Sequence, residues 1–204
     1  NITQNPGSVK EISSTYYQFG RKDALPGTDA IAQGSYSFDN TSGGRSLGYA
    51  IQHPENMFIQ AGTFNSDWCN ATYDNLWSAD NTVESFNDNL VVKTVYDPCP
   101  AGFKMPASNA FTGFTKNGLN EGTKNVSGAW ENGWNFNNKI SSPDATVYFP
   151  AAGCRFDSNG LLLLVGDYGY YWSAVLYNTY RGCTLLFGSS FVIPKNDFPR
   201  PEGF

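Results

Sequence analysis

The sequence lacks most of the residues on which common catalytic and metal sites depend. Its 204 residues include a single histidine, His53, and only 15% of them are charged. One histidine excludes a histidine metal cluster, and any Ser-His-Asp or Cys-His dyad would have to use His53. The next residue, Pro54, favours a loop here, and the GxSxG, P-loop, GxGxxG and HExxH motifs are absent. We therefore interpret His53 as a surface residue and expect neither a catalytic site nor a bound metal.

Positive charge and long apolar runs are also scarce. The chain has 13 Lys and Arg against 18 Asp and Glu, a formal net charge of -5. Nucleic-acid binding depends largely on clustered Lys and Arg, so nucleic acid is excluded as a partner. The longest apolar run, 161–165, is far below the roughly 20 residues needed to cross a bilayer. The chain opens on "NITQNPGS" without a charged and apolar leader, so we expect that a signal or anchor was removed or lies upstream.

The four cysteines are too few and too scattered to define a metal or redox motif. They stand at positions 69, 99, 154 and 183, with no CxxC pair. In an oxidising compartment they allow three disulfide pairings, which is compatible with an exported protein. Cys99 lies between two prolines in "YDPCPAGFKMP", a rigid corner that suits a disulfide.

No motif singles out an acidic pair or a calcium site. Most Asp and Glu residues lie in turn-like sequences such as "YDNLWSADN" and "FDNTSGG", which favours Asx-turns and helix caps over a glycosidase pair. Asp74, Asp80 and Asp88 could offer oxygens to Ca²⁺, yet no EF-hand loop is present. We predict no cofactor, and a structural Ca²⁺ stays an open alternative without a supporting motif.

Aromatic residues and glycine are abundant instead. Rings make up 16% of the chain, with 21 Gly and 11 Pro, which is typical of a loop-rich globular fold whose core is built on rings. Only 80–90, "DNTVESFNDNL", has a helical pattern, with Asp80 or Asn81 as its cap. The Phe and Trp residues within 107–145 predict a loop that packs on itself, and Ser-Asn-Gly in "RFDSNGLLLL" predicts a hairpin. Runs of β-branched and aromatic residues predict strands at 15–20, 91–97, 146–156, 161–166, 170–175 and 184–188.

Four motifs in succession resemble one protein family. They are "YYQFGRKDALPG" (16–27), "VYDPCPAGFKMP" (95–106), "YFPAAGCRFDSNGLLLLVGDYGYYWSA" (148–174) and "PRPEGF" (199–204). They are similar to the C-type-lectin-like domain of fimbrillin-like exported proteins of gut Gram-negative bacteria, of the fibrobacter-major-paralogue type. This resemblance implies an α+β, C-type-lectin-like fold of the formylglycine-generating-enzyme-like branch, loop-rich with short antiparallel strands. We predict a single ligand-binding domain over 1–204, with 1–15 as a lead-in from an upstream segment.

The family often has a closing cysteine that pairs with the cysteine of the DPCP corner. This chain stops at Phe204, before such a residue, so the partner of Cys99 stays open among Cys69, Cys154 and Cys183. The sugar-binding Ca²⁺ signatures of animal C-type lectins, EPN or QPD followed by WND, are absent. The word lectin therefore describes only the expected shape.

Some of these domains are variable proteins of diversity-generating retroelements, whose adenine-directed reverse transcription rewrites codons near the 3′ end of the gene. The end of this sequence resembles such a protein, with "YYWS", a mixed segment over 174–199 and a closing "R..GF". That segment contains only Lys195 among the five residue types that this process does not generate, Lys, Glu, Gln, Met and Trp. The resemblance implies a fixed frame, which consists of Tyr170, Tyr171, Trp172, Ser173, Leu185, Phe187, Val192, Pro194, Arg200, Gly203 and Phe204.

The variable segment, 174–199, is then the predicted binding surface. Its rings offer rigid contact area, and its polar residues offer adaptable hydrogen bonds, as in antibody loops. Leu186, Phe191 and Ile193 could equally be core residues of a sheet, and Cys183 could be half of a disulfide. The predicted ligand-binding residues are Val175, Tyr177, Asn178, Thr179, Tyr180, Arg181, Cys183, Thr184, Leu186, Ser190, Phe191, Ile193, Asp197 and Phe198.

These inferences predict an exported adhesin domain at the cell surface or outside the cell, at a pilus tip or on a lipoprotein, without turnover. Its expected partners are an unknown protein or glycan ligand and pilus subunits, and the isolated domain is expected to be a monomer. One alternative is a structural pilin subunit, whose variable segment would be an assembly surface. The other is a formylglycine-generating-enzyme-like enzyme, for which His53 alone cannot supply an iron site.

Overall fold

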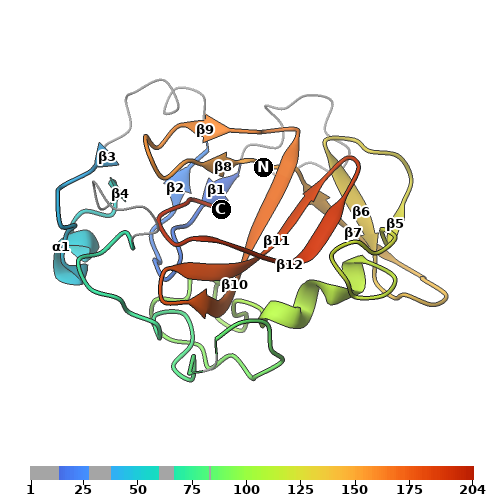
Figure 1. Ribbon diagram of the computed structural model, residues 1–204, viewed down its shortest axis with the longest axis horizontal. Coiled ribbons are helices and arrows are strands. Elements are labelled where there is room, and N and C mark those ends of the chain that lie inside the picture. The colour runs from blue at the N-terminus through green and yellow to red at the C-terminus, as the bar shows by residue number, and fades with distance from the viewer. Residues whose placement is uncertain (1–13, 28–37, 60–66, 83) are drawn as a thin grey trace.

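The computed structural model describes residues 14–27, 38–59, 67–82 and 84–204 (Figure 1). Its strands are short except in one sheet near the C-terminus. They pair antiparallel, apart from the parallel pair β3–β4. The strands are β1 (Thr15–Tyr16), β2 (Leu25–Pro26), β3 (Phe38–Asp39), β4 (Met57–Phe58), β5 (Val126–Ser127), β6 (Gly133–Asn137), β7 (Thr146–Pro150), β8 (Cys154–Arg155), β9 (Leu162–Leu163), β10 (Tyr168–Asn178), β11 (Arg181–Gly188) and β12 (Val192–Pro199).

The predicted α+β class is wrong, because the described structure is mostly β. Strands account for 35% of it and helices for 8%. The two helices are α1 (Leu47–Gln52), of six residues, and the 3₁₀ helix η3 (Ser108–Phe114), of seven. α1 begins after Ser46, whose hydroxyl accepts a hydrogen bond from the Tyr49 backbone N–H at 3.2 Å. Helices this short are stabilised by the structure around them, because they are below the length at which a helix holds itself.

The helix predicted over 80–90 does not form in the described residues of that stretch. Asn81 caps no helix, because its side-chain amide donates to the carbonyl oxygens of Asp74, at 2.7 Å, and Ala174, at 3.0 Å. Ser85 has a φ of 67°, in the left-handed region that an α-helix of L-residues does not use. Long-range contacts therefore set the path of this stretch, and its helical pattern does not.

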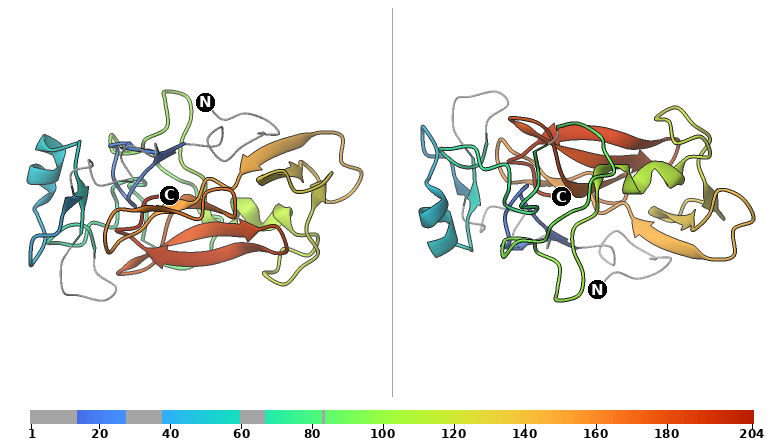
Figure 2. Two further views of the ribbon diagram at one scale, coloured as in Figure 1. Left: turned by 90° about the horizontal axis from the view of Figure 1, so that it is seen from above. Right: turned by 90° about the horizontal axis from the view of Figure 1, so that it is seen from below.

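The largest sheet is an antiparallel meander of β10, β11 and β12. Tyr170 lies opposite Leu186, and Leu186 lies opposite Ile193, so these side chains share one face. Irregular pairing interrupts the register after Trp172 and after Thr184. Figure 2 shows this sheet between α1 at one end of the molecule and β5–β7 at the other.

Both faces of the meander are packed. On one face, Tyr170 stacks on Phe204 at 4.7 Å between ring centroids, and Trp172 lies 4.6 Å from the same ring. On the other face, the fully buried Phe187 meets Phe136 edge-on at 5.4 Å. A sheet that is covered on both sides offers ligands mainly its turns and its edges.

The aromatic residues of 107–145 pack together, as predicted. Phe114 of η3 stacks on Phe136 of β6 at 4.0 Å, and Trp130 meets Trp134 edge-on at 5.4 Å. The stretch is more regular than a loop, because it contains η3, β5 and β6, and β6 pairs with β7. Its cluster of rings covers the Phe187 face of the meander.

The other predicted strands had mixed outcomes. The ranges 170–175 and 184–188 lie inside β10 and β11, and the predicted hairpin forms between β8 and β9. The range 146–156 is divided into β7 and β8, and 161–166 keeps only the two residues of β9. The prediction of a strand at 91–97 is wrong, because its only pairing is an isolated bridge between Lys93 and Ser78. The range 15–20 keeps only β1 and a bridge from Gln18 to Gly203.

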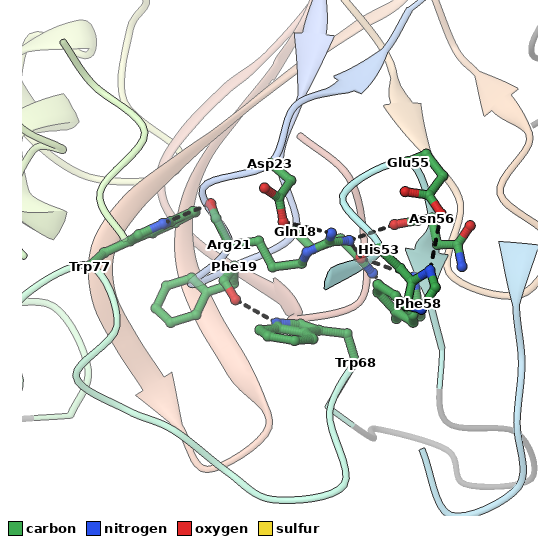
Figure 3. A network of polar contacts seen from close by, with 10 residues as sticks. All are labelled: Gln18, Phe19, Arg21, Asp23, His53, Glu55, Asn56, Phe58, Trp68 and Trp77. Carbon is green, nitrogen blue, oxygen red and sulfur yellow. Dashed lines mark hydrogen bonds and ion pairs between the residues drawn. The ribbon is translucent and has the colours of Figure 1, made fainter. Parts of the chain in front are cut away.

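The first and last motifs of the chain are joined to each other. The Tyr17 N–H donates to the Phe204 carbonyl at 2.7 Å, and the Phe204 N–H returns a bond at 3.1 Å. The fully buried Gln18 amide donates to the carbonyls of Phe58 and Pro201. Figure 3 shows that Gln18 also receives a hydrogen bond from the guanidinium of Arg21, at 2.9 Å. This buried polar network fixes both ends of the described chain around the meander.

The disulfide expected at Cys99 is absent, since all four cysteines are free thiols. Burial, with the nearby Asp97 carboxylate, raises the pKa of Cys99 to about 11. Burial also raises the pKa values of Cys154 and Cys183 to about 12. Each of these three groups is therefore a protonated thiol at neutral pH, which makes it a poor nucleophile.

Reducing agent is expected to leave the thermal unfolding temperature unchanged, because the fold contains no disulfide to break. A native disulfide is worth about 2–5 kcal/mol, which would correspond to a shift of roughly 5–15 °C in a chain of this size. Scanning calorimetry with and without dithiothreitol checks this. Titration of the unfolded protein with a thiol reagent should find all four groups, and a lower count would contradict the prediction.

Candidate binding surface

The turn between β10 and β11 contains two of the three exposed residues of the predicted site, and the third is Ser190. Thr179 and Tyr180 are both exposed, and Tyr180 retains 49% of its accessible surface. The turn is nevertheless held in place. The Tyr180 N–H donates to the Asn178 side-chain oxygen at 3.0 Å, and the Arg200 N–H donates to the Tyr180 carbonyl at 3.2 Å. A large ring is thus presented to solvent on a backbone that is bonded to the frame.

Most of the other predicted site residues are half-buried. Arg181 of β11 forms an ion pair with Asp197 of β12 across the sheet. The Tyr177 ring lies 5.7 Å from the Phe86 ring, which holds it against the neighbouring loop. Tyr177 and Arg181 both lie close to the turn between β10 and β11, which we call the Tyr180 turn. The predicted site residues of intermediate exposure are Tyr177, Asn178, Arg181, Leu186, Phe191, Ile193, Asp197 and Phe198.

Three predicted site residues are buried in the structure. Cys183 has no accessible surface, Thr184 retains 1% and Val175 retains 5%. Phe198 is partly accessible, but its ring packs edge-on against Tyr170 at 5.2 Å. These side chains contribute mainly to packing, and a ligand on the surface would reach them poorly.

The predicted residues fall into two groups at opposite ends of β11. Tyr177 to Arg181 surround the β10–β11 turn, whereas Ser190 and Phe191 belong to the β11–β12 turn. Eight strand residues separate the turns, which corresponds to about 26 Å at the usual rise per residue. This separation is not visible in the sequence, which does not show where the strands reverse.

The frame is buried almost throughout. Ten of its eleven residues are buried, and Tyr171 is half-buried with its hydroxyl donating to the Pro150 carbonyl at 2.8 Å. The Trp172 indole N–H donates to the Tyr17 carbonyl at 2.8 Å, and the Ser173 hydroxyl donates to the Cys183 carbonyl at 3.1 Å. The frame therefore ties the meander to the N-terminal motif.

Arg200 is the most constrained member of the frame. Its guanidinium is fully buried, forms an ion pair with Asp67 at 2.9 Å and a second with Asp74, and lies 5.2 Å above the Phe19 ring. Burial raises the pKa of Asp67 to about 6, and the charge of Arg200 opposes that rise.

An open cleft lies next to the Tyr180 turn, and the sequence did not reveal it. Its volume is about 560 Å³. It combines residues from 72–84 with Leu176 at the end of β10. We call it the acidic cleft, because it contains two carboxylates and no Lys or Arg. Its lining residues are Thr72, Tyr73, Asp74, Asn75, Leu76, Asn81, Thr82, Glu84 and Leu176.

The density of Asp, Asn, Thr and Tyr in "ATYDNLWSADNTVE" was the only local signal for the acidic cleft. Within it, "YDNLWSADN" (73–81) predicts turns and caps, because such residues usually serve there. That interpretation holds for "FDNTSGG", where the Asp39 carboxylate accepts hydrogen bonds from the Thr41 N–H and hydroxyl. It fails for Asp74, which pairs with Arg200, a residue far along the chain.

Residues considered for chemistry do not gather into a site in the described structure. His53 follows α1, its ring lies 4.2 Å from the Tyr49 ring in a tilted arrangement, and its Nδ1 lies 3.2 Å from the Glu55 carboxylate. Among the described residues, no group of three or more His, Cys, Asp and Glu side chains is placed to hold a metal ion, and this includes Asp74, Asp80 and Asp88. None of the helices in the described ranges has the length and apolar character to cross a membrane.

Comparison with known proteins gave no match: no family model, curated protein or solved structure is similar to this chain. The resemblance to the C-type-lectin-like family therefore stays a prediction from the sequence motifs.

Proposed function

We propose that this protein is a ligand-recognition domain displayed at the cell surface, whose segment 174–199 is diversified by a retroelement. It would act as an adhesin at a pilus tip or on a lipoprotein, and it would bind a protein or glycan without turnover. One observation carries the proposal. Ten of the eleven frame residues are buried, whereas eleven of the fourteen predicted ligand-binding residues are half-buried or exposed.

This division of burial suits a surface that changes its sequence while its fold persists. Substitutions at exposed positions usually change stability by less than about 0.5 kcal/mol, whereas truncating a buried ring costs about 3–5 kcal/mol. Tyr180 has the features of a binding anchor, because it is a large ring with a polar end on a turn fixed by hydrogen bonds. The same turn could accept other side chains without loss of the frame.

The proposal is tested by deep sequencing of the 3′ part of the gene across its source population. We expect substitutions at adenines in the codons of 174–199, most frequent at exposed positions such as Thr179 and Tyr180. Codons for Tyr170 to Ser173 and Arg200 to Phe204 should be unchanged. An even spread of substitutions over the gene would refute diversification and leave an ordinary surface domain.

Tyr180→Ala is expected to separate binding from stability. Because the ring is exposed, the free energy of unfolding should change by less than about 0.5 kcal/mol. Affinity for a ligand selected from a peptide or glycan array should fall by about tenfold or more, as for an aromatic anchor. Trp172→Ala is the matched control in the frame, with an expected loss of about 3–5 kcal/mol of stability. Unchanged affinity in the Tyr180 variant would remove this turn from the binding surface.

A further inference from the structure

We propose that the acidic cleft is the fixed half of the binding surface and that it takes a Lys or Arg side chain of a protein partner. This inference rests on the proposed function, because it supplies the ligand chemistry for the same surface. The cleft lies mainly outside the variable segment, so its chemistry would persist while the Tyr180 turn changes.

The acidic cleft is continuous with the Tyr180 turn. Leu176 lines the cleft and directly precedes Tyr177 in the chain. The Leu176 carbonyl accepts a hydrogen bond from the Ser85 N–H at 3.0 Å, and the Phe86 ring contacts the Tyr177 ring. A partner that covers the turn would therefore reach the cleft with a neighbouring side chain.

The walls of the acidic cleft are fixed by the frame. Arg200 binds the Asp74 carboxylate and donates to the Tyr73 carbonyl at 3.4 Å. Asn81 links the Asp74 carbonyl to that of Ala174. A site held by a buried guanidinium and a buried amide loses little conformational entropy when it binds.

The cleft offers hydrogen-bond acceptors that lack donors. Asn81 retains only 7% of its surface, and its Nδ2 group is used by two carbonyls, which leaves Oδ1 as an acceptor. Among the described residues, none donates to Asn81 Oδ1 or to Asp74 Oδ2. The carboxylate of Glu84 is exposed. The Asp74 side chain is 45% exposed, and neither Asn81 Oδ1 nor Asp74 Oδ2 is a buried atom, so both can accept a hydrogen bond from a ligand that enters the cleft.

Charge selects a cation among the possible donors. Asp74 and Glu84 line the cleft with no Lys or Arg among the lining residues, and the buried Arg200 divides its charge between Asp74 and Asp67. Ammonium and guanidinium groups carry donors and no acceptor, which matches the acceptors of the cleft. Leu76 and Leu176 line the cleft but are buried, so the exposed Tyr73 ring is the main apolar contact for the methylene stem of such a side chain and is available for a cation–π contact.

The test uses a fluorescein-labelled hexalysine peptide and fluorescence anisotropy at low salt. Glu84→Gln removes one negative charge from the cleft, and Glu121→Gln removes the same charge from an exposed residue that does not line it. We expect Glu84→Gln to weaken hexalysine binding about three- to fivefold, and Glu121→Gln to change it less than about twofold. Binding should weaken as salt is added, and hexaglutamate should not bind.

Three outcomes would overturn the inference. The first is that hexalysine does not bind, and the second is that Glu84→Gln and Glu121→Gln change its affinity equally. The third is that neutral oligosaccharides bind and that Glu84→Gln weakens their binding as much as it weakens hexalysine binding. The result is also separable from the proposed function. If substitutions are spread evenly over the gene and Glu84→Gln alone weakens hexalysine binding, diversification is refuted and the cation-binding role of the cleft is supported. If substitutions concentrate at adenines and the two variants change hexalysine affinity equally, only the cation-binding role of the cleft is refuted.

Discussion

Arg200→Ala is expected to lower the free energy of unfolding by about 3–5 kcal/mol, because it removes one partner from a buried ion pair. Asp67 would remain almost fully buried without its counter-charge, and Asp74 would lose its guanidinium partner. The Phe19 ring would also lose the cation above it. Urea unfolding followed by tryptophan fluorescence measures the change.

Arg181→Ala is the matched control for Arg200→Ala, because it breaks an ion pair of the same type near the surface. The side chains of Arg181 and Asp197 are 36% and 20% exposed, so solvent screens their attraction. Such pairs contribute about 0–1 kcal/mol. Equal destabilisation by the two variants would contradict the role assigned to burial around Arg200.

The free energy of unfolding is expected to fall as the pH rises from 5 to 9, because of Glu202. This side chain is 5% exposed, and its Oε2 atom has no hydrogen-bond partner among the described residues. Burial, with a smaller contribution from Asp157, raises the pKa of Glu202 from its ordinary 4.5 to about 8. Between these values the folded state keeps a proton that the unfolded chain releases. The stabilisation is therefore complete below pH 4.5 and is lost as the pH rises through 8, a change of roughly 4 kcal/mol.

Glu202→Gln tests this assignment, since glutamine resembles the protonated acid and does not titrate. We expect the variant to lose most of the decline in stability between pH 6 and 9, and to be more stable than the parent protein at pH 9. The raised pKa of Asp67, about 6, gives a decline of the same sign that should remain below pH 6. Parent stability that rises from pH 5 to 9 would contradict the prediction. Chemical unfolding at several pH values supplies the data.

The sequence predicted the central strands because their pattern is local. "YYWSAV" and "TLLFG" are dense in rings and branched side chains, and both lie in the meander. The Ser-Asn-Gly turn likewise carries its own conformational preference, so the β8–β9 hairpin was predictable. The aromatic side chains of 107–145 are favoured in a buried position because of their large apolar surface, and they cover one face of the meander.

The failed predictions concern segments shaped by distant contacts. The helical pattern of 80–90 is overridden because Asn81 bonds to Asp74 and Ala174, which anchors it to β10. The β-rich stretch 91–97 finds only a single bridge, at Lys93, and so forms no strand. Cys99 lies in a rigid corner, as expected, yet no sequence pattern could show that it has no disulfide partner.

The sequence by itself determined the residue types of the variable segment, the abundance of rings for an aromatic core and the two motifs that bond to each other through Tyr17 and Phe204. Only the tertiary structure decided which residues of the variable segment face solvent, because both faces of β11 are packed and accessibility is concentrated at its turns. The acidic cleft was equally invisible in the sequence. Its walls meet only because Arg200 binds Asp74 across more than a hundred residues of chain, a contact that requires the complete fold.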